Sequence, residues 1–342
     1  MKSPKITVFM AAYNSSAYIS EAISSILSQT FKDFELLIVN DGSQDHTVSI
    51  VNSFQDNRIR LIHNSKNKGL VFTRNRALEE AKGDYIAVLD SDDIAFPDRL
   101  QLQYDYMINH PETALCTGHA HIIDERGELT GEQFIVPTGE NVEMHMLFGN
   151  PFIHSSAFFK TSVFRELKGY KNYSVAEDFD FFFRVSEKYS VTNLDHVLVK
   201  YRKHNDNTSK GTIHNFKDIE KQILMEMHGS LEMLVDEAFT EIHYHLFSRN
   251  YSGSTFSEFF MVLNMLKQAN RKVRKFPVEQ FEELLFAKWF ETLSMKQAGI
   301  YALPHLFKGQ AFKKSYLTSK HFRRTFKQTL KGLFQFRTYN KK

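Results

Sequence analysis

The chain has 342 residues, of which 42% are hydrophobic and 24% charged, and its formal net charge is +3 at pH 7. This length allows a full catalytic core and a smaller second region. The single cysteine, Cys116, excludes an internal disulfide framework and fits a reducing compartment. We expect a cytoplasmic protein, because no segment approaches the roughly 20 apolar residues that span a bilayer and the N-terminus lacks an apolar signal core.

The first hundred residues alternate between strand and helix patterns. Apolar, β-prone runs are followed by segments whose apolar residues recur at helical spacing. The expected strands are residues 6–12, 34–39, 59–63 and 85–89, and the expected helices are residues 18–28, 45–54, 71–81 and 97–109. Short connections between such elements predict an α/β fold with a mostly parallel sheet covered on both faces.

The remainder of the chain divides into a mixed part and a helical part. Short strands at 114–117, 156–160, 191–195 and 197–202 are expected to alternate with helices at 162–167 and 179–188. Beyond about residue 212 the pattern is helical. We therefore expect three regions, which are residues 1–210, 211–303 and 304–342.

Three carboxylates follow the strand expected at residues 85–89. Asp90, Asp92 and Asp93, with Ser91 among them, repel one another unless a cation or several donors lie between them. Oxygen ligands at this spacing suit Mg²⁺ or Mn²⁺, which commonly hold substrate phosphates. Ligands bind at the carboxyl ends of strands in open α/β sheets. The structural alternative is a turn that leads into the helix near Pro97, since Asp and Ser are common turn and N-cap residues.

Short motifs spread over residues 4–210 resemble, in order, those of family 2 glycosyltransferases. They are residues 8–14 with 25–30, 39–47, 67–69 with 74–75, 90–93, 150–155, 177–180 and 201–204. Each motif alone is weak evidence, but the ordered set is specific. The resemblance implies the GT-A nucleotide-diphosphosugar transferase fold, a Rossmann-like mixed and mostly parallel sheet, followed here by a helical C-terminal region. It also implies inverting transfer of a single sugar from a nucleotide-diphosphate sugar.

The resemblance assigns a donor site and a metal. Tyr13 is expected to cover the base, usually uracil, and Asp41 to accept an N–H of that base. Asp92 is expected to bind Mn²⁺ or Mg²⁺ at the diphosphate, with His204 as a second ligand and Asp90 as a helper. The expected donor-binding residues are Ala12, Tyr13, Asn14, Asp41, Gly69, Arg74, Asp90, Ser91 and Asp92.

Transfer also requires a base, because the acceptor hydroxyl must lose its proton as it attacks the anomeric carbon. The family position for this base matches Asp178, at the start of an expected helix whose dipole favours the anion. Glu177 and His154 are expected on the acceptor side. The structural alternative is that Glu177 and Asp178 only cap the helix, and Asp180 is expected to be structural.

The C-terminal tail is strongly basic. Twelve Lys and Arg residues and no acidic residue follow Glu291. Phe322, Phe326 and Leu330 recur at helical spacing among these cations, a pattern typical of helices on anionic membrane surfaces. A peripheral enzyme at the inner face of the membrane would meet a saccharide or lipid-linked saccharide acceptor of cell-surface polysaccharide biosynthesis. The alternative is that this helix packs on the protein.

Two other classes of protein remain possible at this point. A sugar nucleotidyltransferase would favour a Gly-rich phosphate loop near the N-terminus, and residues 13–16 do not form one. A non-enzymatic membrane-binding or nucleic-acid-binding protein would fit the basic and aromatic tail. No nucleic-acid motif is recognised, so we expect no nucleic-acid partner.

Overall fold

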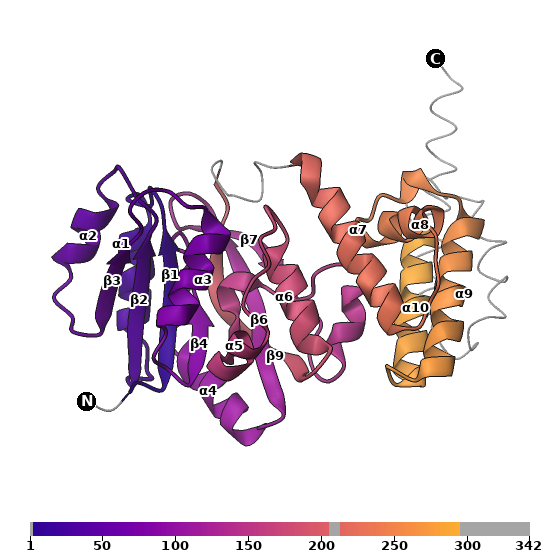
Figure 1. The fold of residues 1–342 in the computed structure, drawn as a ribbon, viewed down its shortest axis with the longest axis horizontal. Helices are drawn as coiled ribbons and strands as arrows, with labels where there is room; N and C mark the ends of the chain where they lie inside the picture. The colour runs from indigo at the N-terminus through magenta and orange to yellow at the C-terminus, as the bar shows by residue number, and fades with distance from the viewer. Residues whose placement is uncertain (1–2, 205–212, 295–342) are drawn as a thin grey trace, which may run out of the picture. The chain divides into compact units, whose positions relative to one another are not determined.

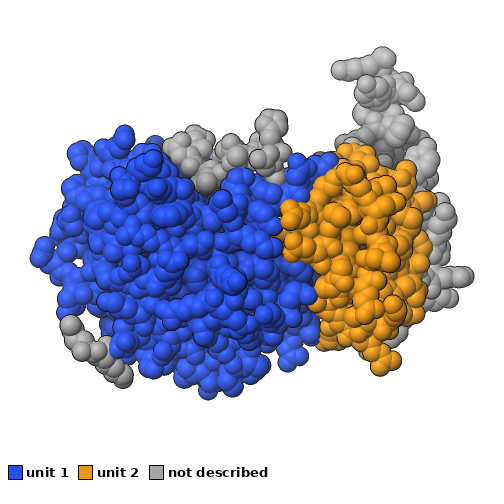
Figure 2. Space-filling view, viewed as in Figure 1, with its two compact units in different colours: residues 1–146, 150–220 blue, residues 147–149, 221–342 orange. Residues whose placement is uncertain are grey.

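The computed structural model of the chain describes residues 3–204 and 213–294. The chain forms two compact units, residues 1–146 with 150–220 and residues 147–149 with 221–342, which Figure 2 colours separately. Unit 1 is an α/β domain, and the described part of unit 2 is helical (Figure 1). The boundary expected at residue 303 and the basic tail lie outside the described residues. Among the helices that are described, none is both long and apolar enough for a membrane span.

Strands and helices alternate through the first part of unit 1, as the sequence predicts. The order is β1 (Ile6–Ala12), α1 (Ile19–Leu27), β2 (Phe34–Asn40), α2 (Thr47–Ser53), β3 (Ile59–His63), α3 (Leu70–Glu80), β4 (Tyr85–Val88), β5 (Ile94–Ala95) and α4 (Arg99–Asn109). Strands β3, β2, β1 and β4 lie side by side in this order and are parallel. Their carboxyl ends therefore meet at one edge of the sheet.

Helices cover both faces of these strands because both faces are apolar. Ile6, Val8 and Met10 of β1 pack in one core with side chains of α1, α2 and α4. Thr7 points to the opposite face, where its hydroxyl accepts hydrogen bonds from the backbone N–H groups of Lys82 and Gly83, just after α3. Burial on both faces explains why these strands read as continuous apolar runs.

The second part of unit 1 completes a mixed sheet. Its elements are β6 (Thr113–Ile123), β7 (Leu129–Phe134), η1 (Val142–Met146), η2 (His154–Ser156), β8 (Phe158–Lys160), α5 (Thr161–Glu166), α6 (Glu177–Ser186) and β9 (Ser190–Arg202). The strand order is β3-β2-β1-β4-β8-β6-β9-β5, with β7 paired to β6. Strand β8 is antiparallel to β4 and β6, while β6 and β9 are parallel. This architecture is the mixed, mostly parallel α/β fold expected.

Two differences from the expected elements have physical causes. Strand β7 was not predicted, because all six of its residues are exposed and show no apolar alternation. The two strands expected at 191–195 and 197–202 form the single strand β9. The exposed polar pair Asp195 and His196 marks a shift in the pairing of β9 with β6 rather than the end of a strand.

The described part of unit 2 is a set of helices around an aromatic core. Its elements are most of α7 (Ile213–Ser230), then α8 (Glu237–Phe247), η4 (Tyr251–Gly253), α9 (Phe256–Val273) and α10 (Val278–Leu293). Trp289 of α10 is buried, and its ring meets those of Phe256 and Phe260 on α9. Thr255 begins α9 with a capping box, which satisfies backbone donors at the helix start.

Two buried histidines join helices α7 and α8. His228 Nε2 lies 2.7 Å from His243 Nδ1, and His243 Nε2 lies 3.0 Å from the Leu147 carbonyl oxygen. The carbonyl can only accept, so His243 Nε2 carries a proton. In the neutral form of His243, its Nδ1 then accepts from His228 Nε2. Burial lowers the pKa of His228 to about 4 and that of His243 well below its usual value.

Unit 2 is expected to lose stability in mild acid. The unfolded chain binds protons at these histidines near pH 6.5, whereas the folded unit does so only near pH 4 for His228. The free energy of unfolding should therefore fall as the pH drops from 6.5 towards 4. Urea titrations followed by fluorescence of Trp289, the single tryptophan, measure this unit selectively.

Replacement of His228 by Gln should reduce this pH dependence, even if it lowers stability at pH 7.5. His196→Gln, at an exposed position in unit 1, is the matched control and should leave the pH dependence unchanged. A pH dependence that persists in full in the His228 variant would show that the buried pair is not its source.

Candidate active site

The expected site residues follow the carboxyl ends of three neighbouring parallel strands. Tyr13 follows β1, Asp41 follows β2, and Asp90 lies just beyond β4. The loops are tied to one another by side chains. Ser15 Oγ and Ser91 Oγ lie 2.9 Å apart, which joins the loop after β1 to the acidic cluster. The sheet therefore brings together groups that are distant in the sequence.

Asp41 organises the loop that precedes α3. Its carboxylate is buried and accepts hydrogen bonds from Asn64 Nδ2 at 2.6 Å, the Lys68 backbone N–H at 2.9 Å and the Gly69 backbone N–H at 2.9 Å. Gly69 has a φ of +89°, a conformation that favours glycine. A carboxylate offers about four acceptor positions, so one position remains beyond these three bonds.

Tyr13 follows the end of β1 and is accessible. It is 47% exposed, whereas Ala12, immediately before it, is buried and accepts the Asp41 backbone N–H at 2.8 Å through its carbonyl oxygen. Asn14 adopts a φ of +48°, and its Oδ1 accepts the Gln44 backbone N–H at 2.9 Å. This bond links the loop after β1 to the turn after β2. A flat ring can therefore stack on Tyr13 next to Asp41.

Asp92 and His204 form a pair at the end of β9. Asp92 Oδ2 lies 2.8 Å from His204 Nε2, and the Asp92 side chain is 25% exposed. The His204 ring also packs on Tyr18, with the ring centroids 5.0 Å apart. Burial raises the pKa of Asp92, and the nearby Asp90 carboxylate adds to this effect. A cation at this pair would relieve the repulsion between the carboxylates.

Asp92 and His204 can supply some of the ligands that Mn²⁺ or Mg²⁺ requires. Carboxylate oxygen suits both metals, and imidazole nitrogen favours Mn²⁺. Within residues 3–204 and 213–294, no group of three or more His, Cys, Asp and Glu side chains is placed to hold a metal ion. Asp92 and His204 would therefore share a metal with ligands from outside the protein, such as phosphate oxygens and water.

Asp93 turns away from this pair into the protein. Its Oδ1 accepts the Arg202 backbone N–H at 2.8 Å, and its Oδ2 is buried without a hydrogen-bond partner among the described residues. Burial, together with the neighbouring Asp92 carboxylate, raises the pKa of Asp93 well above its usual value. Asp93 therefore joins the start of β5 to the end of β9 and has a structural role.

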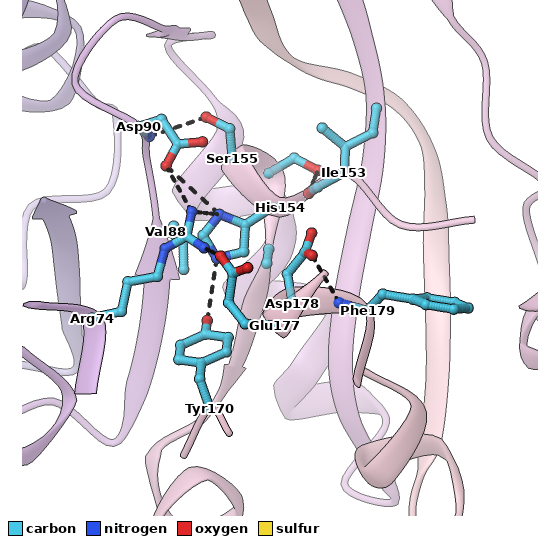
Figure 3. Close-up of polar contacts among 12 residues, drawn as sticks. Arg74, Val88, Asp90, Ile153, His154, Ser155, Tyr170, Glu177, Asp178 and Phe179 are labelled. Atoms are coloured by element: carbon cyan, nitrogen blue, oxygen red, sulfur yellow. Dashed lines mark hydrogen bonds and ion pairs between the residues drawn. The ribbon is translucent and has the colours of Figure 1, made fainter. Parts of the chain in front are cut away.

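Arg74 lies at the centre of a buried polar cluster (Figure 3). Its Nη1 bonds Glu177, and its Nη2 lies 3.1 Å from His154 Nδ1 and 3.6 Å from Asp90 Oδ1. His154 Nε2 lies 3.2 Å from the Tyr170 hydroxyl. The Arg74 side chain is 8% exposed. Residues expected on the donor side and on the acceptor side therefore meet in one network.

Glu177 and Asp178 begin helix α6 with different surroundings. Glu177 is buried against Arg74, and burial raises its pKa while the guanidinium opposes this effect. Asp178 is less buried. Its Oδ1 accepts the Phe179 backbone N–H at 2.8 Å (Figure 3). Its Oδ2 lies 3.5 Å from Asn150 Nδ2. An accessible carboxylate at a helix N-terminus can accept a proton from a bound hydroxyl.

Comparisons with known proteins identify the family. The family model described as Glycosyl transferase family 2 matches residues 7–168. The chain is 34% identical over 237 residues to an uncharacterized glycosyltransferase of Haemophilus influenzae, a match that covers 65% of this chain and 73% of that protein. The chain belongs to glycosyltransferase family 2. The resemblance inferred from the motifs is thereby confirmed.

Two further similarities of this glycosyltransferase concern pathway and fold. It is 32% identical over 214 residues to the O-antigen biosynthesis glycosyltransferase WbnJ of Escherichia coli, which covers 61% of this chain and 83% of WbnJ. The structure of S. aureus TarS 1–349 in complex with UDP-GlcNAc is similar with a TM-score of 0.55 at 17% identity, over 98% of this chain and 92% of that one. This likeness confirms the GT-A fold.

Sequence reasoning gave no role to Arg202, although the family motif at residues 201–204 includes it. The Arg202 guanidinium is buried and donates to the Asp92 carbonyl oxygen at 2.8 Å and to Glu21 Oε2 at 2.5 Å. It thus fixes the backbone of the acidic cluster in this glycosyltransferase. Its position beside His204 in the motif was the available indication, but burial of an arginine cannot be read from sequence.

The backbone before the Glu177–Asp178 pair of the glycosyltransferase is strained. Ala176 has a φ of +56°, a left-handed conformation that a side chain disfavours. Ala176→Gly should therefore raise the free energy of unfolding by about 0.5–1 kcal/mol, after the greater freedom of glycine in the unfolded chain is subtracted. Differential scanning calorimetry measures the change.

The same substitution at Ala157, whose φ is −67°, is the matched control and should destabilise the protein. Equal destabilisation by both substitutions would contradict the assignment of strain to Ala176.

Proposed function

We propose that this glycosyltransferase transfers one sugar, with inversion at the anomeric carbon, from a nucleotide-diphosphate sugar to a hydroxyl of a saccharide acceptor. The observation that carries the proposal is one arrangement of polar groups. Asp41 and the Asp92–His204 pair follow the ends of strands, and Arg74 joins Asp90 to Glu177, the neighbour of Asp178. The reaction requires three parts, which are a site for the nucleobase, a site for the diphosphate and a group that accepts the proton of the acceptor hydroxyl.

The donor is most consistent with a UDP-sugar. The acceptor position left on Asp41 suits one N–H group, and the N3–H of uracil supplies one at the edge of its ring. The exposed ring of Tyr13 is free to cover that base. Ala12 and Asn14 after β1, Gly69 before α3 and the hydroxyl of Ser91 are proposed as further contacts of the sugar donor. TarS, with a similar fold, has been solved with UDP-GlcNAc.

Asp92 and His204 are proposed to hold Mn²⁺ or Mg²⁺ together with the donor diphosphate, and Asp90 is proposed to assist on the ribose side. A divalent cation there supplies positive charge that stabilises the leaving nucleoside diphosphate. The accessible carboxylate of Asp92 and its 2.8 Å contact with His204 support this assignment.

Asp178 is the proposed general base. Its carboxylate takes the proton of the acceptor hydroxyl while the hydroxyl oxygen forms the new bond to the anomeric carbon. The bond from that carbon to the diphosphate oxygen breaks, and its electron pair leaves with the nucleoside diphosphate. Attack on the face opposite the leaving group inverts the anomeric configuration.

The acceptor is proposed to be a saccharide or lipid-linked saccharide of cell-surface polysaccharide biosynthesis. His154 and Glu177 are proposed to lie on the side of the site that binds this acceptor. The similarity to WbnJ, an O-antigen biosynthesis glycosyltransferase, supports this pathway. A lipid-linked acceptor would lie at the inner face of the membrane. The cations after Glu291 are suited to binding that anionic surface.

The donor is identified by screening nucleotide sugars for thermal stabilisation of the protein with and without Mn²⁺. We expect UDP and one or a few UDP-sugars to raise the melting temperature only when the metal is present. Stabilisation by GDP-sugars or CMP-sugars instead would change the assignment of the base, and no stabilisation by any nucleotide would contradict the function.

Asp178→Asn should reduce kcat for transfer by at least about a hundredfold, because the amide cannot accept the hydroxyl proton. Donor binding should change little, since Asp178 is not proposed to contact the nucleotide. The measurements are steady-state transfer with the identified donor and calorimetric titration with UDP and Mn²⁺. Asp195→Asn, whose side chain is 87% exposed, is the control. Full activity of the Asp178 variant would refute the assignment.

Truncation after residue 303 should abolish sedimentation of the protein with vesicles rich in phosphatidylglycerol. The reason is that the truncation removes most of the cations that follow Glu291. The intact protein should sediment with these vesicles and not with pure phosphatidylcholine vesicles. Equal sedimentation of both forms would contradict membrane binding by the tail, and an oligonucleotide mobility shift would favour a nucleic-acid partner.

A further inference from the structure

The Arg74 guanidinium is committed to partners within the protein. Its Nη1 bonds Glu177, and its Nη2 faces both His154 and Asp90. Its Nε is buried without a hydrogen-bond partner among the described residues. Little of this side chain is thus available to a donor molecule, although the sequence predicted that Arg74 binds the donor.

His154 and Tyr170 enclose Arg74 together with its carboxylate partners. His154 Nδ1 lies 3.1 Å from Arg74 Nη2 and 3.6 Å from Asp90 Oδ1. On the other side of the ring, His154 Nε2 lies 3.2 Å from the Tyr170 hydroxyl. The Tyr170 ring also contacts the guanidinium, with a distance of 5.8 Å from the carbon to the ring centroid. Arg74 is therefore held from several sides.

The partners of Arg74 belong to different parts of the proposed reaction. Asp90 follows β4 on the donor side. Glu177 is 103 residues from Arg74 in the sequence and precedes the proposed base, Asp178. A rigid cation between two carboxylates fixes the distance between the elements that carry them. A movement of either carboxylate changes the position of the other through the same guanidinium.

We propose that Arg74 is a positioning residue that ties the donor side of the site to the loop of the general base, through Asp90 and Glu177. This inference rests on the proposed function for the roles of the two sides. The strained backbone at Ala176 supports it, because a left-handed residue directly before Glu177 persists only when surrounding contacts fix it. Arg74 therefore fixes the position of Asp178 relative to the bound sugar donor.

The Arg74→Met variant tests whether Arg74 holds the start of α6 in place. The measurement is hydrogen–deuterium exchange of peptides that cover residues 176–183. Without Arg74, Glu177 loses its partner, so amides in the first turn of α6 should exchange about tenfold faster. The Kd for UDP with Mn²⁺ should change by less than about threefold, because Arg74 is not required to contact the nucleotide. In the parent protein UDP should slow exchange of these peptides, and this effect should be lost in the variant.

Kinetics with the identified donor give a second readout. A lost positioning residue should lower kcat by about thirtyfold or more, with the donor KM within about threefold of the parent value. Arg74→Lys keeps the charge but not the forked geometry, and should recover part of kcat. Arg60→Met, which removes an arginine–glutamate pair with Glu35 elsewhere in unit 1, is the matched control and should leave exchange of residues 176–183 unchanged.

A UDP affinity that falls tenfold or more in Arg74→Met, with unchanged exchange at residues 176–183, would overturn the proposal and make Arg74 a donor ligand. If Arg74→Met does not fold, Glu177→Gln breaks the same pair from the other side and must accelerate the same peptides. If the parent protein does not bind UDP, the proposed donor fails, whereas exchange in the ligand-free proteins still decides whether Arg74 holds the loop.

Discussion

Carboxylates gather near the carboxyl ends of the strands, and the surrounding structure compensates much of their charge. Three of them show how. Asp41 receives amide donors from the loop that it orders, Asp92 lies against His204, and Glu177 binds the buried Arg74. Buried charge without such partners would destabilise the fold by several kcal/mol. Where a carboxylate keeps an unused acceptor position, as Asp41 does, the site can still bind an N–H group or a cation.

Much of the fold was predictable because parallel strands buried on both faces leave a strong pattern in the sequence. The apolar runs of β1, β2 and β4 predicted buried strands, and the segments between them predicted helices. The carboxylates after the strand at residues 85–89, beginning with Asp90, then predicted ligand binding at the carboxyl ends of the strands. This inference needed only the period of the pattern and the rule that ligands bind at these strand ends. The role expected for Asp41 came only from the family resemblance.

Pairings between distant residues could not be predicted from the pattern. Asp92 and His204 are 112 residues apart, and only the family resemblance suggested that they meet. Tyr170 showed no motif, because its role depends on the distance of its hydroxyl from His154. Arg202 shows the same limit, since its buried position depends on the carbonyl groups that surround it. Such contacts are set by tertiary packing rather than by local propensity.

Strand β7 lies off the main order of the sheet, which ends at β3 and β5, and it pairs with β6 alone among the described strands. All six of its residues are exposed, so it presents a strand edge to solvent. Such edges are sites of intermolecular association unless charge or irregular backbone interrupts them. Gly131, with a φ of +80°, and Glu132, paired with Lys203, provide both interruptions within six residues. The composition that hid β7 from sequence analysis is thus the same composition that disfavours association through a strand edge.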